Sequence, residues 1–201
     1  MAFDTPTNYR GIIIRMNNES DSVYFPTLVT EALNHIAETQ TGRTLLAQID
    51  SYHLRQKSNF TVCINRADMT FHTGCSDSWW TGYTGWQNHN KARRVSEFDA
   101  VAASRNAIGS STTNIIYNPN IVLTPDGFRP SWIGLAHELI HAYYNLIGQG
   151  FPSELVKNVK ADIEREEAET VGLGKFTSRN FTENMIRAEA GLKQRVTYGG
   201  L

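Results

Sequence analysis

The residues with the clearest chemistry stand at 137 to 141, where the sequence reads HELIH and fits the pattern H-E-x-x-H. Positions i and i+4 of a helix share a face, so His137 and His141 would project in the same direction. Two imidazoles placed in this way can bind one Zn²⁺ through neutral ring nitrogens. Glu138 lies one step round the helix, where its carboxylate can take a proton from an activated water without being a metal ligand. The spacing therefore predicts His137 and His141 as metal ligands and Glu138 as a general base.

The elements around the motif support this interpretation. A five-residue match with three fixed positions arises by accident in roughly one chain of this length in a hundred. Here the motif lies within a predicted helix that begins at Ser131, a good N-cap residue, and runs to about Ile147, where Gly148 closes it. This helix is amphipathic, and its buried side can be formed by Leu135, Leu139, Ala142 and Leu146. A metal site on a buried helix is therefore the preferred interpretation.

A catalytic zinc site needs a third protein ligand and one open position. Metzincins place a histidine six residues after the second motif histidine, but Ile147 stands there, which excludes that class. The E-x-x-x-D spacing of the thermolysin type does not occur after His141. A charged helix predicted over 153–170 does supply carboxylates. Spacing alone leaves several of them open, among Asp162, Glu164, Glu166, Glu167 and Glu169.

The rest of the pattern predicts an α+β fold. Strands are expected at 11–16, 60–65, 114–117 and 121–124, and further helices at 26–39, 44–52 and 182–191. Strands come mostly first and helices last, which favours a compact single domain with a small N-terminal sheet and a C-terminal helical part. We expect residues 1–9 to be loose and residues 10–201 to form the domain. The tryptophan-containing region 66–109 is expected to consist of long loops.

Composition narrows the class of partner and the compartment. The chain has 201 residues with 19 basic and 20 acidic side chains, so nothing predicts a nucleic-acid or membrane partner, and we expect a monomer. No apolar run approaches the roughly 20 residues that span a bilayer, and the N-terminus lacks a secretory signal peptide. Cys63 and Cys75 are predicted to be free thiols, which favours a reducing compartment.

Two longer motifs carry a resemblance to known proteases. The segment HELIHAYYNLIG resembles the zinc helix of botulinum and tetanus neurotoxin light chains, which is followed by a glutamate in an E-E-x-x-T-x-G context; here 166–172 reads EEAETVG. The resemblance implies Glu167 as third zinc ligand and Glu166 as a group that steadies a histidine. The same proteases carry R-x-x-Y late in the domain. The matching Arg195 and Tyr198 would stabilise the oxyanion.

The size and overall pattern are more similar to the NleD-like effector proteases of type III secreting bacteria. The shared features are HELIHA, EExxTxGL, the run from 181 to 192 and RVTY, which together span 132–198. This resemblance implies a gluzincin-type zinc endopeptidase with one zinc ion. It also implies a virulence factor that is delivered by type III secretion, without a cleaved signal peptide, and acts in the host cytosol. Its implied substrate is a host signalling protein, with the activation loop of a mitogen-activated protein kinase as candidate.

Two other interpretations stay open. The chain could be a zinc-containing interaction protein without protease activity, although a structural site does not need Glu138. It could also be a zinc amidase acting on another bond, such as one in cell-wall peptide, although such an enzyme would need export.

Overall fold

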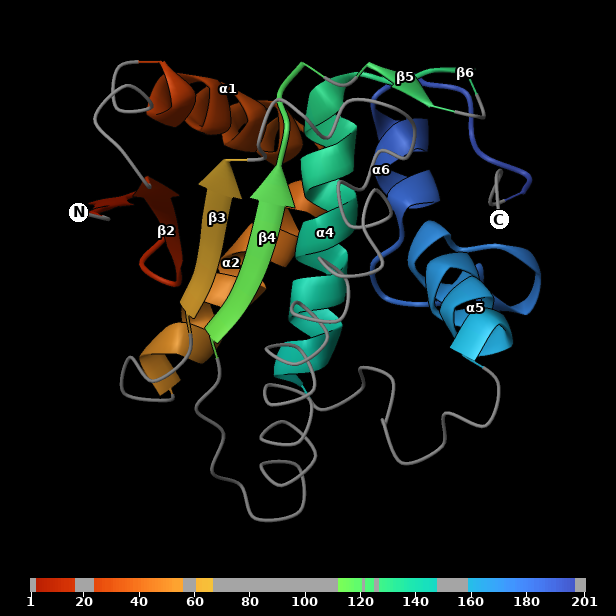
Figure 1. Ribbon diagram of the computed structural model, residues 1–201. Helices are drawn as coiled ribbons and strands as arrows, with labels where there is room; N and C mark the ends of the chain where they lie inside the picture. The colour runs from red at the N-terminus through yellow and green to blue at the C-terminus, as the bar shows by residue number, and fades with distance from the viewer. Residues whose placement is uncertain are drawn as a thin grey trace.

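The computed structural model describes residues 3–16, 24–55, 61–66, 112–120, 122–124, 127–147 and 159–197. Groups of strands and groups of helices follow one another along these residues (Figure 1). The strands are β1 (Phe3–Pro6), β2 (Ile12–Met16), β3 (Thr61–Arg66), β4 (Thr112–Tyr117), β5 (Leu123–Thr124) and β6 (Gly127–Phe128). The helices are α1 (Phe25–Glu38), α2 (Gln40–Arg55), α4 (Ser131–Leu146), α5 (Val159–Val171), the short 3-10 helix η3 (Gly174–Phe176) and α6 (Glu183–Glu189).

The main sheet has the order β1-β2-β3-β4, with β1 antiparallel to β2 and the other pairs parallel. Its register places Ile14 opposite Ile64 and Ile64 opposite Ile115, and all three side chains are buried. Parallel neighbours cannot be joined by a tight hairpin, so the chain needs a crossover between β2 and β3. Helices α1 and α2 supply it, and their apolar faces share a core with the sheet.

Helix α4 is the central element of the fold. It contacts α1, α2, α5, α6 and the edge strand β4 (Figure 1). Side chains on several sides of α4 are fully buried, whereas the sequence predicted an amphipathic helix with one buried side. They include Ile133, Leu135, Ala136, Leu139, Ile140 and Ala142. The two histidines of HELIH therefore project from a helix that is fixed by packing on most sides.

The predicted α+β class, with a small N-terminal sheet and helices in the rest, is confirmed. One detail needs correction, because the segment 1–9, which was expected to be loose, contains β1. Phe3–Pro6 pairs with Ile13–Met16. As an edge strand, β1 can keep its side chains partly exposed, which explains its polar sequence. The strand expected at 121–124 is reduced to the two residues of β5. Of the region 66–109, where loops are expected, only residue 66 belongs to the described residues. The single domain 10–201 therefore stays a prediction.

Among the described residues, none of the helices is both long and apolar enough to cross a membrane. Cys63 in β3 is a buried free thiol, as expected, and Cys75 lies outside the described residues.

Candidate metal centre

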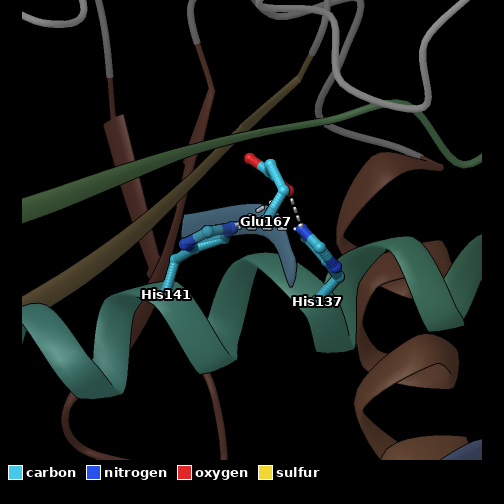
Figure 2. A group of neighbouring side chains, drawn as sticks. All are labelled: His137, His141 and Glu167. Atoms are coloured by element: carbon cyan, nitrogen blue, oxygen red, sulfur yellow. Dashed lines mark hydrogen bonds and ion pairs between the residues drawn. The ribbon is translucent and has the colours of Figure 1, made fainter. Parts of the chain in front are cut away.

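Three buried side chains from two helices converge on one point. His137 and His141 project from successive turns of α4, and Glu167 reaches them from α5 (Figure 2). The Nε2 atom of His137 lies 2.8 Å from Glu167 Oε2 and 3.0 Å from His141 Nε2. The third separation, from His141 Nε2 to Glu167 Oε2, is 3.6 Å. Together the three residues form a group that could hold a metal ion.

The donor set and its spacing suit zinc. Imidazole nitrogen and carboxylate oxygen are ordinary zinc ligands, and tetrahedral bonds of about 2.0–2.2 Å place ligand atoms roughly 3.3 Å apart. The observed separations of 2.8, 3.0 and 3.6 Å lie on both sides of that value. The metal could therefore be accommodated by small side-chain movements, without rearrangement of α4 or α5.

The second nitrogen of each ring is held by a separate partner. His137 Nδ1 lies 2.8 Å from Glu183 Oε2. His141 Nδ1 lies 3.1 Å from Glu166 Oε1 and 3.2 Å from Thr170 Oγ1. A carboxylate that accepts the Nδ1 proton leaves Nε2 as the electron-pair donor and fixes the orientation of the ring. Both histidines are thus held with Nε2 facing the common point.

The charges around the centre favour a cation there. Burial alone would lower the pKa of His137, but hydrogen bonds and the charges of Glu167 and Glu183 outweigh it and raise that pKa well above its usual value. Burial would likewise raise the pKa of Glu167, but the two histidines hold it well below its usual value. The paired carboxylates therefore stabilise positive charge between the imidazoles, which is the charge that a metal ion would bring.

Glu183 is the most deeply buried of these carboxylates. Its Oε1 accepts a hydrogen bond of 2.6 Å from Arg187 Nε, and its Oε2 accepts one of 3.3 Å from Arg195 Nη1. Burial would raise the pKa of Glu183, but His137 and the charges of Arg129 and Arg195 lower it far below its usual range. Glu183 is therefore an ionised carboxylate between His137 and two arginines.

Local sequence explains how α5 and α6 bring these carboxylates together. Thr182 caps α6 by accepting a hydrogen bond of 3.2 Å from the Met185 backbone, which fixes Glu183 in the first turn. At the end of α5, Gly172 has a φ of 84°, and a Cβ there would lie 2.7 Å from Thr182 Cβ. Glycine thus permits the left-handed turn and the close approach between the two helices.

The structure places most of the residues singled out in the sequence near this centre. Glu138 is half-buried on α4 beside the histidines, and Glu166 contacts His141. Arg195 is buried and joins the cluster through Glu183. The Asn184 side chain also holds the Arg195 backbone, through bonds of 2.8 and 2.9 Å. Tyr198 lies outside the described residues.

Sequence reasoning assigned no role to Glu183, Thr170 or Arg129. Glu183 stands in the run 181–192 and Thr170 is the threonine of the E-E-x-x-T-x-G match, so both were inside the resembling motifs. Neither has a local spacing that points to a histidine, because Glu183 meets His137 across 46 positions of sequence. Only the tertiary packing of α6 on α4 creates that contact.

An α+β chain whose H-E-x-x-H helix shares a possible metal site with a glutamate on a following helix has the features of a metallopeptidase. A family model described as effector protein, peptidase family M91, matches residues 14–198. The chain therefore belongs to this family, the NleD-like effector metalloproteases. No curated protein and no solved structure matches it. Family membership supports a protease that acts as an effector, and it implies a host protein as substrate.

Proposed function

We propose that this protein is a zinc-dependent endopeptidase that cleaves a host signalling protein. The observation that carries the proposal is the convergence of His137, His141 and Glu167 in a chain of a peptidase family, with Glu138 next to His137 on the same helix. Zinc is the metal that this combination of ligands favours. Delivery by type III secretion, action as a monomer in the host cytosol and a role in virulence belong to the same proposal.

The chain's residues divide the chemistry of peptide hydrolysis among them. His137, His141 and Glu167 would hold the zinc ion, which when bound would polarise the scissile carbonyl and acidify a water molecule. Glu138 would accept a proton from the attacking water and deliver it to the leaving nitrogen. Glu166 keeps His141 oriented for this task.

Negative charge develops on the carbonyl oxygen during this reaction and needs donors beside it. Arg195 and Tyr198 are proposed to supply them. Arg195 is suited to this role because Glu183 and the Asn184 side chain hold its guanidinium and its backbone in fixed positions. Donors that are held before the reaction begins do not have to be ordered during it.

The sheet offers a place for an extended substrate. Within the described residues β4 is an edge strand of the main sheet, and it packs against α4. An extended peptide can add to such an edge through backbone hydrogen bonds, which would bring its carbonyl groups toward the helix that carries the site. The activation loop of a mitogen-activated protein kinase is the candidate segment that the resemblance to the NleD-like proteases implies.

The test is cleavage by Glu138→Ala, with Glu31→Ala as a control on the exposed face of α1. Both variants should fold and bind zinc as the wild type does. Glu138→Ala should lose cleavage of purified candidate kinases by about 10²–10⁴-fold, the range for a general base, while the control keeps it. Cleavage is followed by mass spectrometry, and an active Glu138→Ala protein would refute the role. A wild type that binds zinc but cleaves no protein would favour the interaction-protein or amidase interpretation.

A further inference from the structure

Arg129 is a buried cation two residues before the start of α4. Its side chain is 2% exposed, and its Nε atom has no hydrogen-bond partner. Among the described residues its guanidinium forms neither a hydrogen bond nor an ion pair; only its backbone nitrogen is bound, to Val122 O at 2.8 Å. Burying a guanidinium without an acceptor is costly, because its Nε–H group loses water and gains no partner in exchange.

Glu183, whose charge interacts with that of Arg129, does not supply the missing partner. Glu183 already receives Arg187 Nε on one oxygen, and Arg195 Nη1 with His137 Nδ1 on the other. Arg129 and the two paired arginines together oppose this single carboxylate. These contacts leave the guanidinium of Arg129 without an acceptor among the described residues. An unpaired buried cation beside a candidate active centre indicates an anionic ligand.

The position of Arg129 relative to α4 is well defined. A Cβ at Gly134 would lie 2.8 Å from Arg129 Nη2, so the guanidinium lies against the helix at a point where a larger residue would collide with it. Gly134 precedes His137 by three residues, which is the same face and about 4.5 Å along the axis. The unpaired cation thus lies about one helical turn from the candidate metal centre.

Two further features of this end of α4 suit an anion. Tyr117 donates a hydrogen bond of 3.2 Å to Ser131 Oγ, which leaves the Ser131 hydroxyl proton available to an acceptor. The amino end of a helix also favours negative charge. The preceding residue Phe128 is 72% exposed in β6, so Arg129 follows directly on a strand at the surface.

We infer that Arg129 recognises a carboxylate of the polypeptide substrate, the side chain of an aspartate or glutamate close to the scissile bond. The inference rests on the proposed function and adds a substrate preference to it. A guanidinium and a carboxylate can form two parallel hydrogen bonds, which explains why an arginine is suited to this position. The substrate would then supply the acceptor that the described residues do not provide for Arg129.

A first experiment tests the missing partner without using protease activity. Arg129→Met replaces the buried cation by an unbranched apolar side chain. Arg187→Met does the same at an arginine that is also buried but is bound to Glu183 and Lys193 O. Thermal unfolding of the zinc-loaded proteins should place Arg129→Met at or above the wild type and Arg187→Met below it. A loss of stability in Arg129→Met as large as in Arg187→Met would show that Arg129 has a structural partner, and would overturn the inference.

A second experiment measures the preference itself. A peptide library with acetylated N-termini and amidated C-termini confines carboxylates to side chains, and mass spectrometry maps the cleaved bonds. Wild type should favour an acidic residue at one fixed position by roughly 10- to 100-fold, the range for a hydrogen bond to a charged group. Arg129→Met should lose that preference, as should Gly134→Ala, whose methyl group displaces the guanidinium. The exposed control Arg43→Gln should keep it.

The outcomes separate the inference from the proposed function. Two results would overturn the inference and leave the proposed function intact. One is a uniform loss of rate in Arg129→Met with the acidic preference unchanged, and the other is the absence of any such preference in the wild type. If the wild type cleaves no peptide, the proposed function is refuted, and succinate binding then tests the inference. Succinate should raise the unfolding temperature of the zinc-loaded wild type more than that of Arg129→Met, and an equal rise in both would overturn it.

Discussion

At the scale of single residues, each histidine of the candidate centre gives one nitrogen to the common point and the other to an oxygen-bearing side chain. The two arrangements differ in strength. His137 relies on Glu183, which is fully buried and held by two arginines. His141 divides its contacts between Glu166, which is partly exposed, and Thr170. Loss of the partner of His137 should therefore do more damage than loss of either partner of His141.

The first prediction concerns Glu183→Gln. The amide cannot balance Arg187 and Arg195, and it accepts the Nδ1 proton of His137 more weakly. Zinc affinity should fall by about 10- to 100-fold, as for other groups that hold a metal ligand. The free energy of unfolding should fall by about 3–5 kcal/mol, as when a buried ion pair is broken.

Chelator competition and urea unfolding measure the two effects of Glu183→Gln. Glu38→Gln on the exposed surface of α1 is the matched control and should behave as the wild type in both assays. Zinc affinity equal to that of the wild type in Glu183→Gln would contradict the role given to Glu183.

Thr170→Val removes only the hydroxyl that lies 3.2 Å from His141 Nδ1. Its site is buried, so valine keeps the packing, and Glu166 still holds the ring. Zinc affinity should therefore fall less than in Glu183→Gln, and Thr170→Ser should restore it. A larger loss in Thr170→Val than in Glu183→Gln, by the same chelator competition, would reverse the proposed ranking of the two partners.

At the scale of elements, local sequence predicts some features well and others not at all. The periodicity of 131–147 predicts α4 to within a residue, because this helix is fixed by its own apolar pattern and by Ser131 at its start. The strands β2 and β3 are likewise predicted closely from short apolar runs. Their parallel pairing is not predictable from those runs, since pairing depends on the crossover through α1 and α2. Local sequence also does not show which carboxylate of α5 approaches α4. Glu167 could therefore be chosen among five carboxylates only through the family resemblance.

The corner between α5 and α6 gives the next prediction. Gly172 and Gly174 both have positive φ values, of 84° and 56°, but only Gly172 has a close neighbour, Thr182. Gly174→Ala should cost about 1–2 kcal/mol of stability from backbone strain alone. Gly172→Ala should cost about 1–3 kcal/mol more, because the new methyl collides with the cap of α6.

Calorimetry of the two alanine variants measures this difference. Zinc affinity should also fall in Gly172→Ala alone, since displacement of α6 moves Glu183 away from His137. Equal destabilisation of the two variants would show that the contact with Thr182 does not matter for the corner.

At the scale of the whole molecule, the candidate centre joins parts of the chain that are distant in sequence. Its ligands come from α4 and α5, its supporting carboxylate comes from α6, and α4 also packs against the sheet and against α1 and α2. A metal ion bound there would act as a cross-link between these helices. Stability and catalysis should therefore depend on the same site.

Removal of the metal tests that dependence. A ligand that binds only the folded state at 1,000 times its Kd adds about 4 kcal/mol of stability. A chelator should therefore lower the unfolding temperature of the wild type, and added zinc should restore it. His141→Ala is the matched control, since it lacks a ligand and should respond to neither treatment. If the unfolding temperature of the wild type also changes with neither the chelator nor added zinc, the metal does not join the helices.

In the proposed site, His137, His141 and Glu167 hold one zinc ion. The zinc content per chain, by elemental analysis after dialysis, should be compared between the wild type and Glu167→Gln. One zinc ion per chain is expected in the wild type and clearly less in the variant, because the variant loses one of three ligands. No zinc in the wild type at any supplied concentration, or the same content in both proteins, would contradict it.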